Sequence, residues 1–285
     1  MSLRDILHKR HTIAGLRNKY LPWFSGPRRA LNHDPDLSRR LYIDLMKKCL
    51  TDSIYWDARE GPYLRPDLFP DGTGWRRYAH TMVKMARLDN LQYCVERVIS
   101  DKIPGDLIET GVWRGGASIL MRAILKAHDI RDQAVWLADS FQGMPASDPG
   151  YPADADMTFH TIPELSVPLE QVKANFAKYD LLDDQVRFLK GWFSDTLASA
   201  PIEQLSVIRL DGTMYGSTMD ALTALYPKLQ DGGFLIVDDY GAFPACRQAV
   251  HDYRDAHGVV DPIQTIDGAG VYWRRGRGPN TSDLR

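Results

Sequence analysis

Cysteine is scarce in this chain of 285 residues, and its spacing matches neither a disulfide framework nor a metal site. The three cysteines, Cys49, Cys94 and Cys246, lie far apart in the sequence. Isolated thiols in a chain of this length are typical of buried side chains rather than of a disulfide-stapled secreted domain. The sequence therefore predicts a cytoplasmic protein of the size of an enzyme.

Long apolar runs and an excess of one charge are absent as well. No run approaches the roughly 20 apolar residues that span a bilayer. Charges at Arg4, Asp5, Lys9 and Arg10 interrupt the N-terminus where a signal peptide has its apolar core. The formal net charge of −2 argues against wholesale nucleic-acid binding. We therefore expect neither a membrane nor a nucleic acid as a partner.

The dinucleotide pattern G-x-G-x-x-G and the P-loop G-K-[ST] are both missing. In their place, residues 106–116 (DLIETGVWRGG) predict a short strand that ends in an acid, a glycine turn, and a helix that begins at Ala117. Gly111 lets the chain turn, while Gly115 and Gly116 let backbone approach a ligand or the strand closely. Because backbone N–H groups at such a turn face the head of the sheet, the stretch predicts a pocket for a small, partly charged molecule. The alternative is a tight turn without a ligand.

After about residue 104 the chain alternates between apolar runs and helical stretches. The runs predict strands at 107–108, 135–138, 186–189, 207–210 and 234–237. Helices are expected at 81–100, 118–128, 168–178 and 218–229. The first four runs lack polar–apolar alternation, as expected of strands buried on both faces. The pattern predicts an α/β fold with a doubly wound, mainly parallel, Rossmann-like sheet that binds ligands beyond the carboxyl ends of its strands.

The N-terminal part, residues 1–75, predicts extra helices and a loop. Residues 1–30 carry seven Lys or Arg and one acid. Their loose apolar stripe favours a solvated or partner-packing helix over a membrane or nucleic-acid arm. Residues 35–60 look helical, with one face formed by Leu37, Leu41, Leu45 and Met46. The segment 60–71 is broken by prolines into a loop that could cover a site.

Informative side chains follow the second and third strands. Asp139 lies 23 residues after Gly116, where an acid commonly accepts hydrogen bonds from ribose hydroxyls; the alternative is a helix N-cap. Trp192, next to Gly191, is suited to the face of an adenine or to the core. The long insertion at 144–167 is either a mobile lid or a solvated loop.

Three carboxylates follow the last two predicted strands. Asp211 ends one strand, and Asp238 and Asp239 end the next. Such a cluster is costly unless a cation or shared protons compensate the repulsion, and oxygen-only ligands select a hard ion such as Mg²⁺. The three residues therefore predict a magnesium site, with helix caps and solvated loop acids as the alternative.

Taken together, these motifs resemble the macrocin O-methyltransferase family of S-adenosylmethionine-dependent enzymes, which act on sugars or phenols of natural products. The resemblance runs from about residue 75 to 275 and rests on the segments 79–82, 104–116, 138–141, 191–193, 209–212 and 232–240. It implies a class I methyltransferase domain at 76–275, preceded by the helical region 1–75 and followed by a flexible tail at 276–285.

The resemblance also implies site residues. Contacts to S-adenosylmethionine are expected from Thr81, Met82, Glu109, Gly111, Ser118, Asp139, Ser140, Gly191 and Trp192. Ligands to Mg²⁺ are expected to be Asp211, Asp238 and Asp239.

One segment departs from the family pattern Asp-Gly-Asp-[Leu/Met]-Tyr-Glu-Ser-Thr. Residues 211–218 read DGTMYGST, so Thr213 replaces the second acid and Gly216 replaces the glutamate. That second acid is a candidate for the general base, and a threonine cannot take a proton at neutral pH. The first choice for the base is then Asp211, with His160 and His251 as further candidates.

The predicted function is metal-dependent O-methyl transfer to a sugar or phenol hydroxyl of a secondary metabolite. Three alternatives stay open. The first is an enzyme that uses S-adenosylmethionine for a reaction other than ordinary methylation. The second is a nicotinamide-dependent oxidoreductase, and the third is a non-catalytic protein that binds S-adenosylmethionine. The expected partner is a small molecule, and a homo-oligomer is possible.

Overall fold

The computed structural model describes residues 34–54, 63–64 and 75–276. The basic segment 1–30, most of the loop at 60–71 and the tail beyond residue 276 lie outside these residues. The chain forms two compact units, residues 1–40 and 41–285, and the second unit holds the sheet. None of the helices in the described part of the chain is long and apolar enough to cross a membrane.

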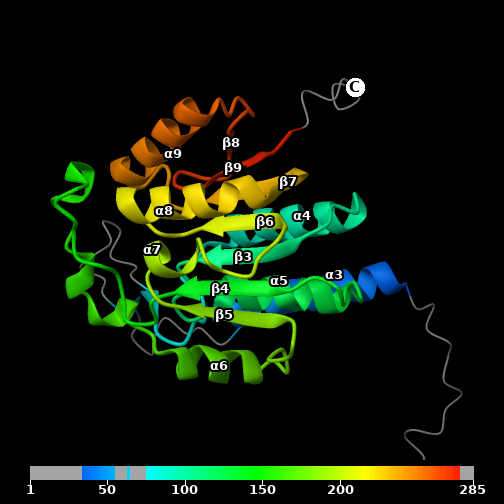
Figure 1. The fold of residues 1–285 in the computed structure, drawn as a ribbon. Helices are drawn as coiled ribbons and strands as arrows, with labels where there is room; N and C mark the ends of the chain where they lie inside the picture. The colour runs from blue at the N-terminus through cyan, green and yellow to red at the C-terminus, as the bar shows by residue number, and fades with distance from the viewer. Residues whose placement is uncertain (1–33, 55–62, 65–74, 277–285) are drawn as a thin grey trace, which may run out of the picture. The chain divides into compact units, whose positions relative to one another are not determined.

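A seven-stranded sheet forms the centre of the second unit, in the order β5-β4-β3-β6-β7-β9-β8 (Figure 1). Its strands are β3 (Asp106–Thr110), β4 (Val135–Asp139), β5 (Val186–Lys190), β6 (Leu205–Leu210), β7 (Leu229–Val237), β8 (Gln264–Thr265) and β9 (Val271–Arg274). The first five run parallel, whereas β9 is antiparallel to both β7 and β8. All five predicted strands are confirmed. A separate antiparallel pair joins β1 (Tyr63–Leu64) to β2 (Trp75–Arg76).

The prediction that the first four strands are buried on both faces is correct for β3, β4 and β6 and wrong for β5. Strand β5 lies at the edge of the sheet and pairs only with β4. Its Arg187 and Lys190 are exposed. Charged side chains are common on edge strands because they discourage pairing with another chain.

Helices cover both faces of the sheet, so the doubly wound prediction is confirmed. They are α3 (Pro35–Leu50), α4 (Met85–Ser100), α5 (Gly116–Ala127), α6 (Leu169–Ala177), α7 (Phe193–Thr196), α8 (Tyr215–Leu225) and α9 (Pro244–His257). One core cluster joins α4, α5 and α6 to the sheet, and a second joins α8 and α9 to its other side. Helix α9 and strands β8 and β9 were not predicted from the sequence.

Three predicted helix boundaries move. The helix expected over 35–60 ends at Leu50, and residues 51–54 form turns. The helix expected from residue 81 begins at Met85, and Thr81 lies in the loop before it, where its Oγ1 accepts the backbone N–H of Val83 at 3.1 Å. The helix expected to reach residue 229 ends at Leu225, followed by a 3-10 turn that contains Pro227. Proline has no N–H for the helical hydrogen bond and clashes with the preceding turn.

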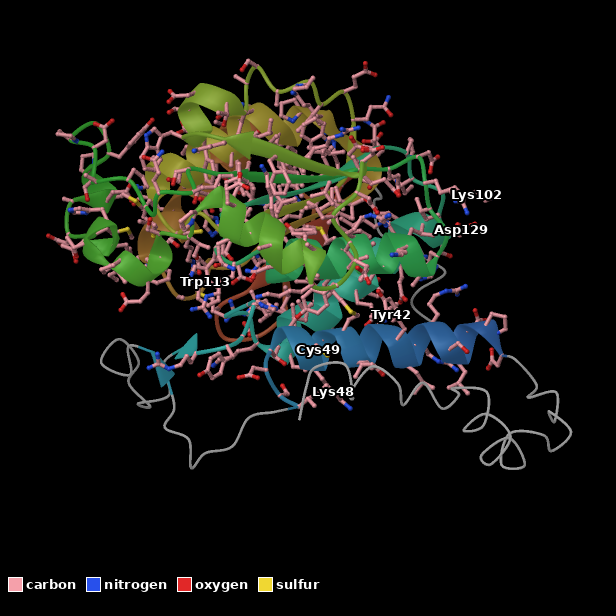
Figure 2. The ribbon with its side chains drawn as sticks, turned by 90° about the horizontal axis from the view of Figure 1, so that it is seen from below. Tyr42, Lys48, Cys49, Lys102, Trp113 and Asp129 are labelled. Atoms are coloured by element: carbon pink, nitrogen blue, oxygen red, sulfur yellow. The ribbon has the colours of Figure 1, made fainter. Side chains whose placement is uncertain are left out.

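Helix α3 buries a different face from the one predicted. Ile43, Met46 and Leu50 are in the core, whereas Leu41 and Leu45 are exposed. Figure 2 shows Tyr42 of α3 on the side of the helix that faces the core and Lys48 on the opposite side. Met46 therefore does not share a face with the leucines.

The insertion at 144–167 is built from three 3-10 turns, Pro152–Asp154, Phe159–Thr161 and Pro163–Leu165. In Figure 1 these green turns lie beyond the arrowheads of the parallel strands. Strand β3 lies between β4 and β6, so the order of the sheet reverses beside it. That reversal point is where an open α/β sheet leaves a crevice for a ligand.

Candidate functional site

A cavity of about 430 Å³ opens at the carboxyl ends of the strands, a size within the range of small-molecule sites. Eight of the predicted site residues line it: Thr81, Met82, Glu109, Gly111, Asp139, Ser140, Trp192 and Asp211. Trp192 is 38% exposed, so the alternative of a core tryptophan is wrong. Ser118, Gly191, Asp238 and Asp239 are not on the cavity wall.

The glycine turn brings three backbone segments together. Gly111 has a φ of 83°, and a side chain there would collide with the carbonyl of Asp211. A Cβ on Gly116 would lie 2.5 Å from the carbonyl oxygen of His80 and from Cβ of Thr81. The close approach predicted for Gly116 is confirmed, although its partner is the loop at His80 and Thr81 rather than the strand or a ligand. At Gly115 a Cβ would instead meet the side chains of Val172 and Phe176.

Asp139 ties the end of β4 to this turn. Its Oδ2 accepts the backbone N–H of Val112 and its Oδ1 accepts that of Phe141, both at 2.7 Å. Burial raises the pKa of Asp139, and these backbone donors oppose the rise. The next helical segment begins only at Pro152, so the N-cap alternative for Asp139 is wrong. The acid sets the shape of the turn and still contributes to the cavity wall.

Glu109 at the end of β3 is held by two side chains. Ser118 Oγ donates to its Oε2, and Arg209 Nη1 donates to its Oε1 at 2.6 Å. Burial raises the pKa of Glu109 to about 7, with Arg209 and Ser118 acting in the opposite direction. Ser118 is fully buried behind Glu109, so it orients that carboxyl group and does not face the cavity.

Arg209 connects the glycine turn to the carboxylate cluster, and the sequence analysis missed it. The side chain is 1% exposed and lies within β6. Its Nη1 lies 2.8 Å from Asp211 Oδ2, and its Nη2 lies 2.6 Å from Asp238 Oδ1. An arginine inside an otherwise apolar strand is the signal that could have found it, because a buried cation requires buried acids.

The structure brings the three predicted metal ligands together. One carboxylate oxygen each of Asp211, Asp238 and Asp239 lies within 4.8 Å of the others. The pKa of Asp239 lies well above its usual range. Burial is the main cause, and the negative charges of Asp211 and Asp238 add to it. Burial also raises the pKa of Asp211, although Arg209 opposes the effect. The cluster therefore holds more negative charge than its neighbours neutralise.

The donor set fits a hard divalent cation. Asp238 Oδ1 is buried and accepts no hydrogen bond, although Arg209 lies close enough for an ion pair. Arg87 Nη1 donates a hydrogen bond to the other oxygen of this carboxylate, Asp238 Oδ2. An unsatisfied carboxylate oxygen beside two further carboxylates suits an ion with oxygen ligands, such as Mg²⁺.

Thr213, which departs from the family pattern, faces the cluster. Its Oγ1 donates to Asp239 Oδ2 at 2.6 Å. Its φ of 60° is left-handed, a conformation that β-branched residues adopt only under strain and that Asp or Asn tolerates better. The backbone at position 213 would therefore suit an aspartate better than the threonine that it carries.

The insertion is fastened to the start of α8. Asp154 is 1% exposed and accepts the backbone N–H groups of Tyr215 at 2.7 Å and Gly216 at 3.0 Å. Trp113 Nε1 also donates to the carbonyl of Glu164 at 2.8 Å (Figure 2 labels Trp113). The alternative of a purely solvated loop is therefore wrong.

The two histidines proposed as bases lie away from the cavity. His160 is exposed on the insertion, and neither residue lines the wall. His251 is exposed on α9, where its Nε2 shares a hydrogen bond of 2.8 Å with the hydroxyl of Tyr240.

Comparison with known proteins matches residues 64–275 to the macrocin-O-methyltransferase (TylF) family. A 4′-O-methyltransferase of 8-demethyl-8-(2,3-dimethoxy-α-L-rhamnosyl)-tetracenomycin C from Streptomyces olivaceus is 57% identical over 244 residues, covering 83% of this chain and 93% of the relative. The mycinamicin III 3″-O-methyltransferase of Micromonospora griseorubida is 52% identical over 252 residues, covering 85% and 98%.

Solved structures agree with this match. The O-methyltransferase NovP shares 51% identity and a TM-score of 0.78, covering 84% of this chain and 100% of its own. The calicheamicin methyltransferase CalS11, at 18% identity and a TM-score of 0.55, shares the fold. The oxidoreductase alternative is not supported, because the related enzymes transfer methyl groups. This chain belongs to the macrocin-O-methyltransferase (TylF) family and is an O-methyltransferase.

Proposed function

We propose that this enzyme moves a methyl group from S-adenosylmethionine to a sugar hydroxyl of a glycosylated natural product, with Mg²⁺ held by Asp211, Asp238 and Asp239. The observation that carries the proposal is a single cavity whose wall includes both the glycine turn and Asp211. A donor bound at the turn and an acceptor bound at the carboxylates would then meet in one cavity, and positioning of this kind lowers the barrier by several kcal/mol.

The donor end is built from Glu109, Gly111, Asp139 and Ser140, which share the cavity wall with Thr81 and Met82. Glu109 and the backbone of the turn suit the charged methionine portion. Trp192 offers an apolar face for the adenine. Asp139 lines the cavity beside Ser140 and would accept hydrogen bonds from the ribose hydroxyls in addition to the main-chain N–H groups that it already accepts.

The acceptor end is built around Asp211. Bound Mg²⁺ would orient the acceptor hydroxyl and lower its pKa. Of the three carboxylates in the cluster, Asp211 is the one on the cavity wall, which makes it the first candidate to accept the proton. Arg209 Nη1 donates to its Oδ2 at 2.8 Å, which leaves lone pairs on the carboxylate for both the metal and the proton.

The proposed acceptor class follows the related enzymes. One relative's name specifies position 4′ of a rhamnosyl tetracenomycin, and another's specifies position 3″ of mycinamicin III. A third relative, the demethyldecarbamoylnovobiocin O-methyltransferase of Streptomyces niveus, is 51% identical over 247 residues. We carry over to this chain only the class, a sugar hydroxyl of an antibiotic-like metabolite, and not the position or the aglycone. The cytoplasmic location and the possible homo-oligomer stay predictions.

The test measures cofactor and metal separately. Calorimetric titration with S-adenosylhomocysteine, with and without Mg²⁺, should show saturable binding. Labelled S-adenosylmethionine should then transfer its methyl group to one of the three metabolites named for the relatives, and chelation should stop the reaction. Absence of cofactor binding would refute the proposal, and turnover unaffected by chelation would refute its metal part.

A second candidate, a diverged reaction with the same cofactor, is favoured by one observation. Thr213 occupies the place of the family's candidate base and instead bonds Asp239. Thr213→Asp discriminates between the two. A gain in methyl transfer of tenfold or more, within the usual contribution of general-base catalysis, would indicate a weakened methyltransferase. Unchanged turnover would indicate that another group accepts the proton.

A further inference from the structure

The second departure from the family pattern, Gly216, is in contact with the insertion. A Cβ on Gly216 would lie 2.7 Å from Cδ2 and 2.8 Å from Cε2 of the Tyr151 ring. Real Cβ atoms do not approach other atoms so closely, because van der Waals repulsion rises steeply at such distances. The ring of Tyr151 can occupy this place only because residue 216 has no side chain.

Interactions of three neighbouring residues, Asp154, Ser147 and Tyr215, hold the segment around Tyr151 in place. Asp154, three residues further on, accepts the N–H groups at the start of α8, including that of Gly216. Ser147 Oγ donates to the carbonyls of Asp154 at 2.6 Å and Met157 at 2.9 Å, which folds the segment upon itself. The rings of Tyr151 and Tyr215 lie 5.6 Å apart. The position of Tyr151 is therefore built into the fold.

The C-terminal half of the insertion also packs against a helix. The ring of Phe159 meets that of Phe243, at the start of α9, edge to face at 5.4 Å. The segment is thus attached to both helices that follow the carboxylate-bearing strands.

This contact lies within the cavity. Tyr151 and Gly216 line the same wall as Thr213 and Met214, which follow Asp211 in the chain. At positions 213 and 216 this wall has a hydroxyl already bonded to Asp239 and a glycine covered by the ring of Tyr151. Asp220, on the same helix as Gly216, lines the cavity as well.

We propose that Tyr151 is an acceptor-specificity residue, and that its ring selects a sugar presenting an apolar face, such as a deoxygenated or O-alkylated pyranose, over one rich in free hydroxyls. The inference rests on the proposed function, since it assigns the acceptor end of the same cavity. An aromatic ring stabilises contact with C–H groups, and the ring of Tyr151 is held in the cavity wall beside Gly216.

A matched pair of probes tests the preference. Methyl α-L-rhamnoside and its 2,3-di-O-methyl ether differ only in two hydroxyls, and their dissociation constants are measured on the full chain with S-adenosylhomocysteine and Mg²⁺ present. The wild type should bind the ether more tightly, and Tyr151→Ala should weaken ether binding about tenfold, as expected for loss of an aromatic contact. Tyr151→Phe should keep the preference because it keeps the ring.

Gly216→Ala tests the steric coupling. It should weaken ether binding as much as Tyr151→Ala does, because the new methyl displaces the ring. The double variant should bind no worse than Tyr151→Ala alone, since the clash is then gone. Thr223→Ala, exposed on the same helix, is the control and should leave both constants unchanged.

Cofactor affinity separates the possible failures. The dissociation constant of S-adenosylhomocysteine should change less than twofold in every variant. Equal affinity of the wild type for the two probes, binding of neither, or additive effects of the two substitutions would overturn the inference. A wild type that fails to bind S-adenosylhomocysteine would instead overturn the proposed function.

Discussion

The two ends of the cavity hold their acids in opposite ways. At the glycine turn, Asp139 accepts two backbone N–H groups and Glu109 is bonded by Ser118 and Arg209. At the other end, Asp239 receives only the hydroxyl of Thr213 within the described residues, and its pKa is raised well above the usual range by burial and by the neighbouring carboxylates.

This difference teaches what each end is prepared for. At the turn, the acids accept hydrogen bonds from backbone and side-chain donors of the protein itself. The carboxylate end carries repulsion that a cation would relieve. Arg209 links the two, because its guanidinium group reaches Glu109, Asp211 and Asp238. The preorganised glycine turn suits a methyl donor bound in a fixed position. The uncompensated charge at the carboxylates suits an acceptor bound through a metal ion.

The largest effect is expected from Arg209→Met, which removes the link between the ends. Three acids, of which Glu109 and Asp238 are buried, would lose their common cation, and breaking a buried ion pair from one side costs about 3–5 kcal/mol. Urea unfolding should show this loss. Arg122→Met is the control, because Arg122 pairs at 2.6 Å with Asp183, whose side chain is 39% exposed. Similar losses in both variants would contradict a special role for Arg209.

Asp239→Asn should separate metal binding from folding. We expect a loss of activity of at least about 100-fold, because a carboxylate ligand is gone. The unfolding free energy without Mg²⁺ should rise, because a like charge is removed from the cluster.

Asp139→Asn should destabilise the glycine turn without affecting the metal site. One of the two backbone N–H groups would face an amide NH₂ instead of an oxygen, which costs about 1–3 kcal/mol. Affinity for Mg²⁺ should be unchanged. If Asp139→Asn rather than Asp239→Asn abolished Mg²⁺ binding, the contrast between the two ends would be wrong.

Gly116→Ala should damage the donor end by steric means. The added Cβ would meet backbone of His80 and the side chain of Thr81 at 2.5 Å, and overpacking of this kind costs about 1–3 kcal/mol. The affinity for S-adenosylhomocysteine should fall with stability. Gly268→Ala is the matched control, since nothing lies within 4 Å of its Cβ position. Equal behaviour of the two variants would argue against close packing at the turn.

The smallest effect is a pH dependence at the donor end. Burial, with Lys178 and Arg114, lowers the pKa of His80 from 6.5 to about 4. Between these values the unfolded chain binds a proton that the folded chain does not, so stability is lost as pH falls from 6.5 towards 4.

His80→Phe should remove that loss, and the difference between wild type and variant should be flat above pH 6.5. Urea midpoints at pH 7.5, 5.5 and 4.5 measure it. His160→Phe, at an exposed position, should not reproduce the effect. A difference that grew on the alkaline side would show that His80 is charged in the fold.

Part of the site was predictable because parallel strands align their carboxyl ends. Four apolar runs are followed by an acid: Glu109, Asp139, Asp211 and Asp238. In a parallel sheet these acids all lie at the carboxyl ends of the strands, independently of the loop conformations. Side chains whose roles depend on distant partners were missed. Nothing in the local pattern around Asp154 indicates that it caps α8, 61 residues further on.

The sequence by itself determined the class of fold, the edge of the sheet that carries the chemistry, and the acids gathered there, because periodicity and strand ends are local properties. Tertiary structure alone decided which acids are already neutralised and which are not. That outcome depends on where Arg209, Ser118 and backbone N–H groups come to lie relative to each carboxylate. It likewise decided that Gly216 makes room for Tyr151, since steric fit between distant segments exists only once the chain has folded.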